Sequence, residues 1–162
     1  METSSPELVY ASWPRRLLSG LIDAAVISFM ALPFPATRHV VDAFSKGANV
    51  SGSDLRAASV VNLLLTVGYM TALHAMNGST FGKMAARTAV RNEDGTKVSP
   101  QVAFVRAVAL AGIQFISAFL IAPMVVNELR PLWSPRRQTW HDVIAKTVVV
   151  TLGSESQQNL TE

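Results

Sequence analysis

Three apolar segments dominate this sequence, and each is long enough to cross a lipid bilayer. Residues 17–34, 57–76 and 102–126 carry most of the hydrophobic side chains. A helix needs about 20 residues to span a hydrocarbon core of about 30 Å. Because lipid offers the backbone no hydrogen-bond partners, such segments fold as helices. The sequence therefore predicts an all-α membrane protein with three transmembrane helices.

Charged residues are scarce, and most of the basic ones flank the apolar segments. Only 15% of the 162 residues are charged, against about 25% in soluble domains. The net charge is +3 at pH 7. Basic residues beside apolar segments are typical of topology signals and of contact with anionic lipid headgroups, rather than of nucleic-acid binding. We therefore expect the lipid bilayer as a partner and no nucleic acid.

The polar segments delimit one membrane domain. Residues 1–14 are polar, and residues 153–162 form a polar tail that we expect to be disordered. The chain between them, residues 15–152, has the length of a single domain. Within it, residues 35–56 carry Pro, Gly and mixed charges, which predicts a loop between the first two membrane helices.

Two short segments have the pattern of β-strands. Residues 87–91 alternate in polarity, and residues 147–152 are rich in Val and Thr; residues 140–146 predict a short amphipathic turn. The two strand-like segments can pair at the membrane surface if they lie on the same side. This requires the third apolar segment to bend at Pro123 into a re-entrant hairpin. A full crossing and a re-entrant hairpin therefore both remain open for that segment.

The basic residues favour a cytoplasmic N-terminus if the third segment is re-entrant. With three full crossings, nearly equal numbers of Lys and Arg lie on the two sides, which decides nothing under the positive-inside rule. With a re-entrant third segment, one side holds only the basic residues of the first loop, which are Arg38, Lys46 and Arg56. We therefore expect a multi-pass protein of the cell membrane with its N-terminus in the cytoplasm.

Ionisable residues inside the apolar segments lie near one side of the membrane. In antiparallel crossings, Asp23, His74 and Arg106 come to a similar shallow depth. Such residues usually face the bundle interior and pair. We expect Asp23 to pair with Arg106, with Arg16 two turns before Asp23 on the same helix face. These four residues form either a proton or cation site, with Asp23 as the titrating carboxylate, or a structural salt bridge that fixes helix packing.

Other motifs predict no further chemistry. Residues 78–83 (GSTFGK) are one residue short of a phosphate loop and lack its final Ser or Thr. His141 and Asp142 stand alone, without further ligands at metal spacing, and the chain has no cysteine. We therefore predict no metal site, no cofactor and no enzyme activity. No internal repeat is evident, which argues against an inverted-repeat transporter within one chain.

Taken in chain order, these segments resemble the RDD family of small bacterial membrane proteins, which is named for one Arg and two Asp residues. The resemblance spans about residues 13–150. The matching residues are Arg15, Arg16 and Asp23 in the first helix, Gly78, Gly82 and Lys83 in a G-x-T-x-G-K turn, Arg106 at the start of the last helix, and His141 and Asp142 in the C-terminal signature. The resemblance implies that Arg16 (or Arg15), Asp23 and Asp142 are the charges that name the family.

The resemblance implies a function only in outline, because the activity of the family is mostly unassigned. Transport, including sodium/proton exchange, has been proposed for some members. We therefore expect a protein involved in the transport of ions or small solutes. The alternative is a structural or accessory subunit that transports nothing itself. In either case we expect a homo-oligomer or other membrane-protein partners.

Overall fold

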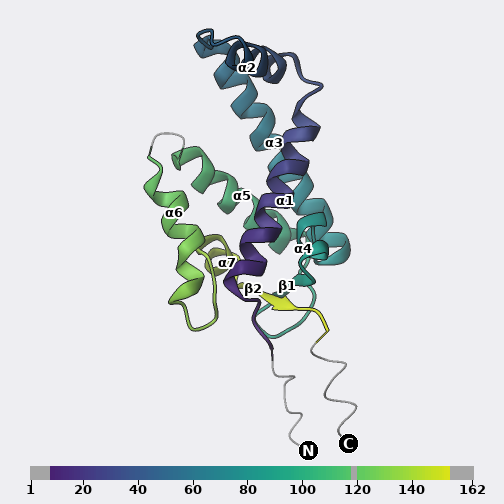
Figure 1. Ribbon diagram of the computed structural model, residues 1–162. Helices are drawn as coiled ribbons and strands as arrows, with labels where there is room; N and C mark the ends of the chain where they lie inside the picture. Colours follow the sequence, from purple (N-terminus) through teal and green to yellow (C-terminus); the bar gives the residue numbers. More distant parts are fainter. Residues whose placement is uncertain (1–7, 118–119, 154–162) are drawn as a thin grey trace, which may run out of the picture.

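The computed structural model of the protein describes residues 8–117 and 120–153. The polar segment expected at residues 1–14 is therefore described only from residue 8. The tail that we expect to be disordered lies, from residue 154 onward, outside the described residues. The described chain is mostly helical, and a small two-stranded sheet closes one end of the helix bundle (Figure 1).

The bundle is built on three long helices, α1 (Trp13–Ala31), α3 (Gly52–Asn77) and α5 (Pro100–Ser117), of which α3 packs against both others. Helices α3 and α5 are each long and apolar enough to cross a membrane. Helix α1 meets that condition only together with α2 (Pro35–Ser45), across a bend of 106°. The described residues thus hold two candidate spans, or three if the bent pair is one span.

Helix α2 occupies much of the segment that we predicted as a loop. Pro35 stands at its first position, where the missing N–H is tolerated because no intrahelical acceptor is available there. Residues 46–51 do form a connection, and Ser51 caps α3 by accepting a hydrogen bond from the Asp54 N–H at 3.1 Å. The loop prediction is therefore wrong for residues 35–45.

The third apolar segment is a helical hairpin. Helix α5 ends at Ser117, and α6 (Ala122–Leu129) packs back against it (Figure 1). Pro123 lies in the first turn of α6, and a short 3-10 helix, η1 (Arg130–Leu132), follows. Residues 102–126 are therefore not one continuous helix: the helix breaks before Pro123 rather than at it, and α5 by itself is long and apolar enough to cross a membrane.

The sheet joins segments that are far apart in the chain. Strand β1 (Thr88–Asn92) pairs antiparallel with β2 (Thr147–Thr151), which confirms the predicted pairing of the two strand-like segments. The residues before α1 also join β2, through a bridge between Tyr10 and Val150. The first long helix therefore starts directly at the sheet.

Two segments repeat the same local structure, which we did not predict. Residues 78–92 and 137–151 each contain a short helix, α4 (Phe81–Ala85) or α7 (Trp140–Ile144), followed by a strand. In both, one residue with positive φ precedes the short helix and another precedes the strand. These residues are Gly78 and Arg87 in the first segment and Arg137 and Lys146 in the second.

Equivalent side chains in the two segments make equivalent hydrogen bonds. Ser79 Oγ donates to the carbonyl oxygen of Thr88 at 2.9 Å. In the second segment, Gln138 Nε2 donates to the carbonyl oxygen of Thr147, also at 2.9 Å. The expectation that the chain has no internal repeat is therefore wrong at the level of structure.

The repeat extends to the long helices. Ala11 precedes α1 and Val98 precedes α5, and both pack with Val90 and Val149 in one buried cluster. Helix α1 contacts α3 and the short helix α4. In the same way, α5 contacts α6 and the short helix α7. Strands β1 and β2 occupy equivalent places in the two repeats and pair antiparallel. The two repeats are therefore related by an approximate two-fold axis. Both α1 and α5 start at the sheet and run away from it (Figure 1), so this axis runs along the bundle.

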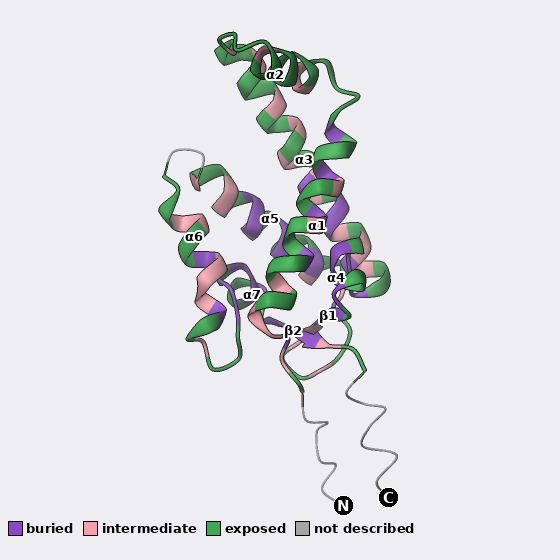
Figure 2. Ribbon diagram, in the orientation of Figure 1, coloured by how far each residue is buried: buried purple, intermediate pink, exposed green. Residues whose placement is uncertain are grey.

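Burial is concentrated near the sheet. In Figure 2 the buried residues gather around the strands, the short helices and the nearby turns of α1, α3 and α5. Helix α2 has no buried residue. Large apolar side chains elsewhere are exposed, such as Phe29 on α1 and Ile121 beside α6, at 74% and 76%. An apolar outer surface of this kind fits a lipid environment.

Truncating either valine of the buried cluster is expected to destabilise the fold. Val90 and Val149 are 0% and 2% exposed, so Val90→Ala and Val149→Ala should each lower the free energy of unfolding by about 2 kcal/mol. Val143→Ala, at a 42% exposed position, should change it by less than about 0.5 kcal/mol. Denaturant titration in detergent checks this, and equal effects at all three positions would contradict it.

Candidate functional site

A buried carboxylate of α1 lies in a cradle formed by α3 and the start of α4. Asp23 is 1% exposed. Its Oδ1 accepts hydrogen bonds from Tyr69 Oη at 2.7 Å and from the Gly82 N–H at 2.8 Å. Its Oδ2 accepts one from Thr80 Oγ1 at 2.6 Å, and the ammonium of Lys83 lies 4.0 Å from Oδ2. Both carboxylate oxygens are therefore hydrogen-bonded, and a positive charge stands beside them.

Glycine at position 82 lets α4 lie directly on α1. A Cβ there would stand 2.0 Å from the carbonyl oxygen of Ser19 and 2.9 Å from Oδ1 of Asp23. Gly78, with φ at +68°, caps α3 in the left-handed conformation and starts the turn. Residues 78–83 therefore share with a phosphate loop the use of a backbone N–H to bind an anion. The anion here is the chain's own carboxylate.

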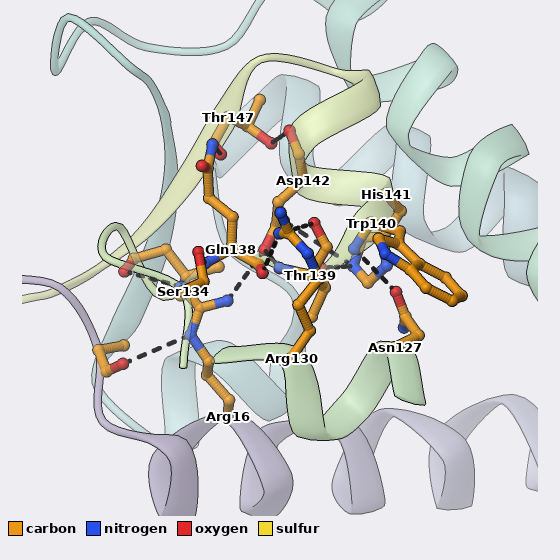
Figure 3. A network of polar contacts seen from close by, with 12 residues as sticks. Arg16, Asn127, Arg130, Ser134, Gln138, Thr139, Trp140, His141, Asp142 and Thr147 are labelled. Atoms are coloured by element: carbon orange, nitrogen blue, oxygen red, sulfur yellow. Dashed lines mark hydrogen bonds and ion pairs between the residues drawn. The ribbon is translucent and has the colours of Figure 1, made fainter. Parts of the chain in front are cut away.

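A second buried carboxylate lies between two arginines. Asp142, on α7, is 0% exposed. Its Oδ2 accepts a hydrogen bond from Arg16 Nη1 at 2.9 Å, and its Oδ1 accepts two from Arg106, at 2.6 and 3.0 Å. The Thr139 N–H also donates to Oδ2, at 3.1 Å, so that Asp142 reaches back to cap its own helix (Figure 3). One carboxylate is therefore shared by two guanidinium groups.

The expected pair between Asp23 and Arg106 does not form among the described residues. Asp23 faces α4 and Lys83, whereas Arg106 faces α7 and Asp142. Arg16, which we expected beside Asp23, also turns to Asp142. The reason is that α3 packs against both α1 and α5, while each of these helices packs on the short helix of its own repeat.

Burial and charge set the protonation of the groups on the short helices. Burial, together with the charge of Arg106, lowers the pKa of Lys83 to about 8. The same two causes lower the pKa of His141 to about 3. Burial opposes ionisation of Asp142, but the charges of Arg106 and Arg16 hold its pKa well below the usual range. Asp142 is therefore ionised and His141 neutral at pH 7, while Lys83 titrates within about one unit of neutral pH.

Two histidines are buried near these groups. His74, on α3, is 1% exposed, and neither of its ring nitrogens has a hydrogen-bond partner in the described part of the chain. His141 Nε2 lies 3.1 Å from Thr139 Oγ1, and its Nδ1 is buried without a partner. Buried polar atoms without partners are unfavourable, so these nitrogens are positions where water would bind.

A cavity of about 80 Å³ connects the two carboxylate sites. It has room for at least about two water molecules. We call it the charged cavity, because ionisable side chains from both repeats line it. These are Arg16, Asp23, Lys83, Arg106, Glu128 and His141.

The structure brings most of the predicted site residues together, with two exceptions. Arg15 is exposed and has no side-chain partner among the described residues, so Arg16 is the arginine in the site. His74 is buried but does not line the charged cavity. The described residues also contain no group of three or more His, Asp or Glu side chains that could hold a metal ion.

Four residues of the site were missed by sequence reasoning, among them Glu128 near the end of α6. Thr80 and Thr139 each stand at the N-cap of a short helix, and a search for N-cap residues before these helices could have found them. Tyr69 lies within the most uniformly apolar segment of the sequence. Its hydroxyl reaches Asp23 only because α3 packs on α1, so no local signal identifies it.

The comparisons with known proteins identify a family. The sequence model of the RDD family matches residues 10–146 of the chain. The matched range contains both carboxylate sites and all the helices. Neither the curated proteins nor the solved structures include a match.

Adding a methyl group at Gly82 is expected to open the Asp23 cradle. Gly82→Ala should lower the free energy of unfolding by about 3 kcal/mol, because the new Cβ would overlap the backbone of α1. Gly68→Ala is the control, since nothing lies within 4 Å of its added Cβ. It should keep stability or raise it by up to about 1 kcal/mol, because alanine favours helix. Thermal unfolding in detergent compares them, and equal melting temperatures would refute the close contact.

His141 is expected to make the fold sensitive to acid. Its folded-state pKa of about 3 lies below the ordinary value of 6.5, so between these pH values the unfolded state binds a proton that the folded state does not. Stability should therefore fall as pH falls from about 6.5 to 3, by up to about 1.4 kcal/mol per pH unit. His141→Asn should lose this part of the slope, and His39→Asn, at an exposed histidine, should keep it. Unfolding titrations across this range measure the difference.

Proposed function

The chain belongs to the RDD family, and from this premise we propose that it is a membrane transporter that exchanges a monovalent cation for a proton in the charged cavity. The observation that carries this proposal is the position of that cavity between two structural repeats, with ionisable side chains from both. Membrane proteins rarely bury such side chains except along ion or proton pathways. In transporters built from repeats, the substrate site lies at the repeat interface.

The exchange rests on the pair of Asp23 and Lys83. When Lys83 is protonated, its ammonium neutralises the Asp23 carboxylate 4.0 Å away. Loss of the proton leaves that carboxylate without a counter-charge in a desolvated site, which favours a cation from water. Reprotonation of Lys83 then expels the cation. Protonated Lys83 and a bound cation exclude each other. One cation is therefore exchanged for one proton, and the charge of the site stays constant.

Asp142 has a different part in this mechanism. Its two arginines and the Thr139 N–H already satisfy its oxygens, so it stays ionised and holds Arg16 and Arg106 in place. Burial and then the positive charge of Arg106 lower the pKa of Lys83 against the opposing charges of Asp23 and Asp142, which brings proton loss towards physiological pH. The second carboxylate therefore tunes the first site without binding the cation.

The proposed topology has three membrane segments, of which α5 and α6 form a re-entrant hairpin. The ends of α2 and α3 that lie away from the sheet carry the basic residues Arg38, Lys46 and Arg56, while the other Lys and Arg residues lie towards the sheet. The positive-inside rule then supports a cytoplasmic sheet and N-terminus in the cell membrane. The proposed partners are lipids and further copies of the chain.

The second candidate is an accessory subunit without transport of its own, and neither candidate is an enzyme. The observation in its favour is that both carboxylates are hydrogen-bonded on each oxygen. A network that is satisfied in this way can serve only to fix the helices. Under this alternative the charged cavity would hold water and nothing else.

Transport is tested with the full chain in liposomes that contain a pH-sensitive dye, under an imposed Na⁺ or K⁺ gradient. The wild type should move protons against the cation gradient, and Asp23→Asn and Lys83→Met should fall to the rate of empty liposomes. Glu93→Gln, which breaks an exposed ion pair with Arg136, should retain the wild-type rate. Folded wild type without flux under either gradient would contradict transport, and a stably copurified membrane protein would then support the accessory role.

A further inference from the structure

A second, larger cavity lies in the half of the bundle that is farther from the sheet. Its volume is about 420 Å³. We call it the polar cavity, because hydroxyl and amide side chains from α1, α2, α3 and α5 line it. They are Ser28, Thr37, Ser59, Asn62 and Gln114. No acidic or basic side chain lines this cavity.

The polar side chains of this cavity lie at the depth of the hydrocarbon core. At 1.5 Å per residue, Asn62 lies about 15 Å along α3 from Gly52, in a helix about 39 Å long. Gln114 lies about 21 Å along α5 from Pro100. Asn62 therefore stands near the middle of α3, and Gln114 stands about one turn before α5 ends at Ser117; both helices are apolar enough to cross a membrane.

All of these polar side chains except Ser59, which donates to the carbonyl oxygen of Leu55 at 2.8 Å, lack partners in the described part of the chain. In the part of the chain that the structure describes, no side-chain hydrogen bond involves Ser28, Asn62 or Gln114. Thr37 Oγ1 is buried and has no hydrogen-bond partner either. Amides and hydroxyls without partners are strongly unfavourable in hydrocarbon. Their convergence on one cavity indicates that the cavity contains water.

The helical hairpin explains why the cavity exists. Helix α5 ends at Ser117, well below the far end of α3, and α6 then returns towards the sheet (Figure 1). The far halves of α1 and α3 consequently have no third long helix beside them. Backbone that leaves a helix at membrane depth is tolerated where it is covered by protein or lines a water-filled cavity. The end of α5, with Gln114, lies at the polar cavity.

A layer of apolar side chains separates the polar cavity from the charged cavity. Ile27, Met70 and Leu110 belong to one buried cluster, and the last two also line the charged cavity. Gln114 of the polar cavity stands one helical turn beyond Leu110. The two cavities therefore follow one another along the bundle, and this apolar layer is the barrier between them.

We propose that the polar cavity is a water-filled vestibule through which small hydrated cations and protons approach the charged cavity from the α2 side of the membrane, with Ile27, Met70 and Leu110 as the closed gate. Neutral oxygen atoms line such a vestibule without trapping the ion, since no carboxylate binds it there. The role in transport rests on the proposed function. The presence of water in the cavity does not, and it is tested separately.

Water in the cavity is tested by thiol labelling, because the chain has no cysteine and each variant then carries a single thiol. Asn62→Cys and Gln114→Cys are compared with Leu64→Cys and Ile116→Cys, which lie two residues further along the same helices and do not line the cavity. In lipid vesicles, a charged, membrane-impermeant methanethiosulfonate should modify the first pair at least about tenfold faster, because thiolates form in water. Equal rates would overturn the vestibule, as would a disulfide between two copies at position 62, since a second chain would then fill the cavity.

The gate is tested by truncating one of its side chains. Leu110→Ala should raise the passive proton leak of protein-containing vesicles several-fold, because water then joins the two cavities. Val108→Ala, at an exposed position two residues away, should leave the leak unchanged. An unchanged leak in Leu110→Ala would overturn the gate. Fast labelling without transport would support the vestibule and contradict the exchange mechanism. Slow labelling with active transport would contradict the vestibule and support the exchange mechanism.

Discussion

Desolvated charge is the constraint on which the rest of this structure depends. Asp23 and Asp142 are almost completely buried, and an unpaired carboxylate in such a place would be unfavourable by several kcal/mol. Each one is therefore surrounded by donors from elements that are distant in the chain. Helix α4 must lie on α1, and α7 on α5, for these hydrogen bonds to form. The two ion clusters thus fix the ends of the long helices against the sheet.

The two repeats use the same local structure to place charged side chains of opposite sign. The sequences TFGKMAARTAV and TWHDVIAKTVV, from residues 80 and 139, each supply a capping threonine, a charged fourth residue and a strand. Lys83 occupies that fourth position in one unit and Asp142 in the other. The long helix of each unit carries the complementary charge, which is Asp23 or Arg106. The charged cavity lies where the two units meet, and the shorter hairpin of the second unit leaves the polar cavity beside α1 and α3.

Much of the fold could be predicted because its signals are local. The apolar length of α3, the alternation in β1 and the Val-rich β2 are properties of single segments, and Pro123 marks the start of a helix, because it lies in the first turn of α6. The partners of the charged residues could not be predicted in this way. Asp23 and Arg106 were expected at similar depth, but α3 and the short helices decide which charges meet. The repeat was missed although four of the eleven positions from residues 80 and 139 are identical, because the matching stretch is short and carries opposite charges at its fourth position.

By itself, the sequence determined that this is a membrane protein, that the family is RDD, and that a few ionisable residues interrupt its apolar segments. These conclusions follow from hydrophobic length and from motifs, which do not depend on how the helices pack. Only the tertiary structure decided that Lys83 belongs to Asp23, that Arg16 and Arg106 share Asp142, and that two cavities follow one another along the bundle. The physical reason is that an ion pair or a cavity is a relation between segments, and its geometry arises only when those segments pack together.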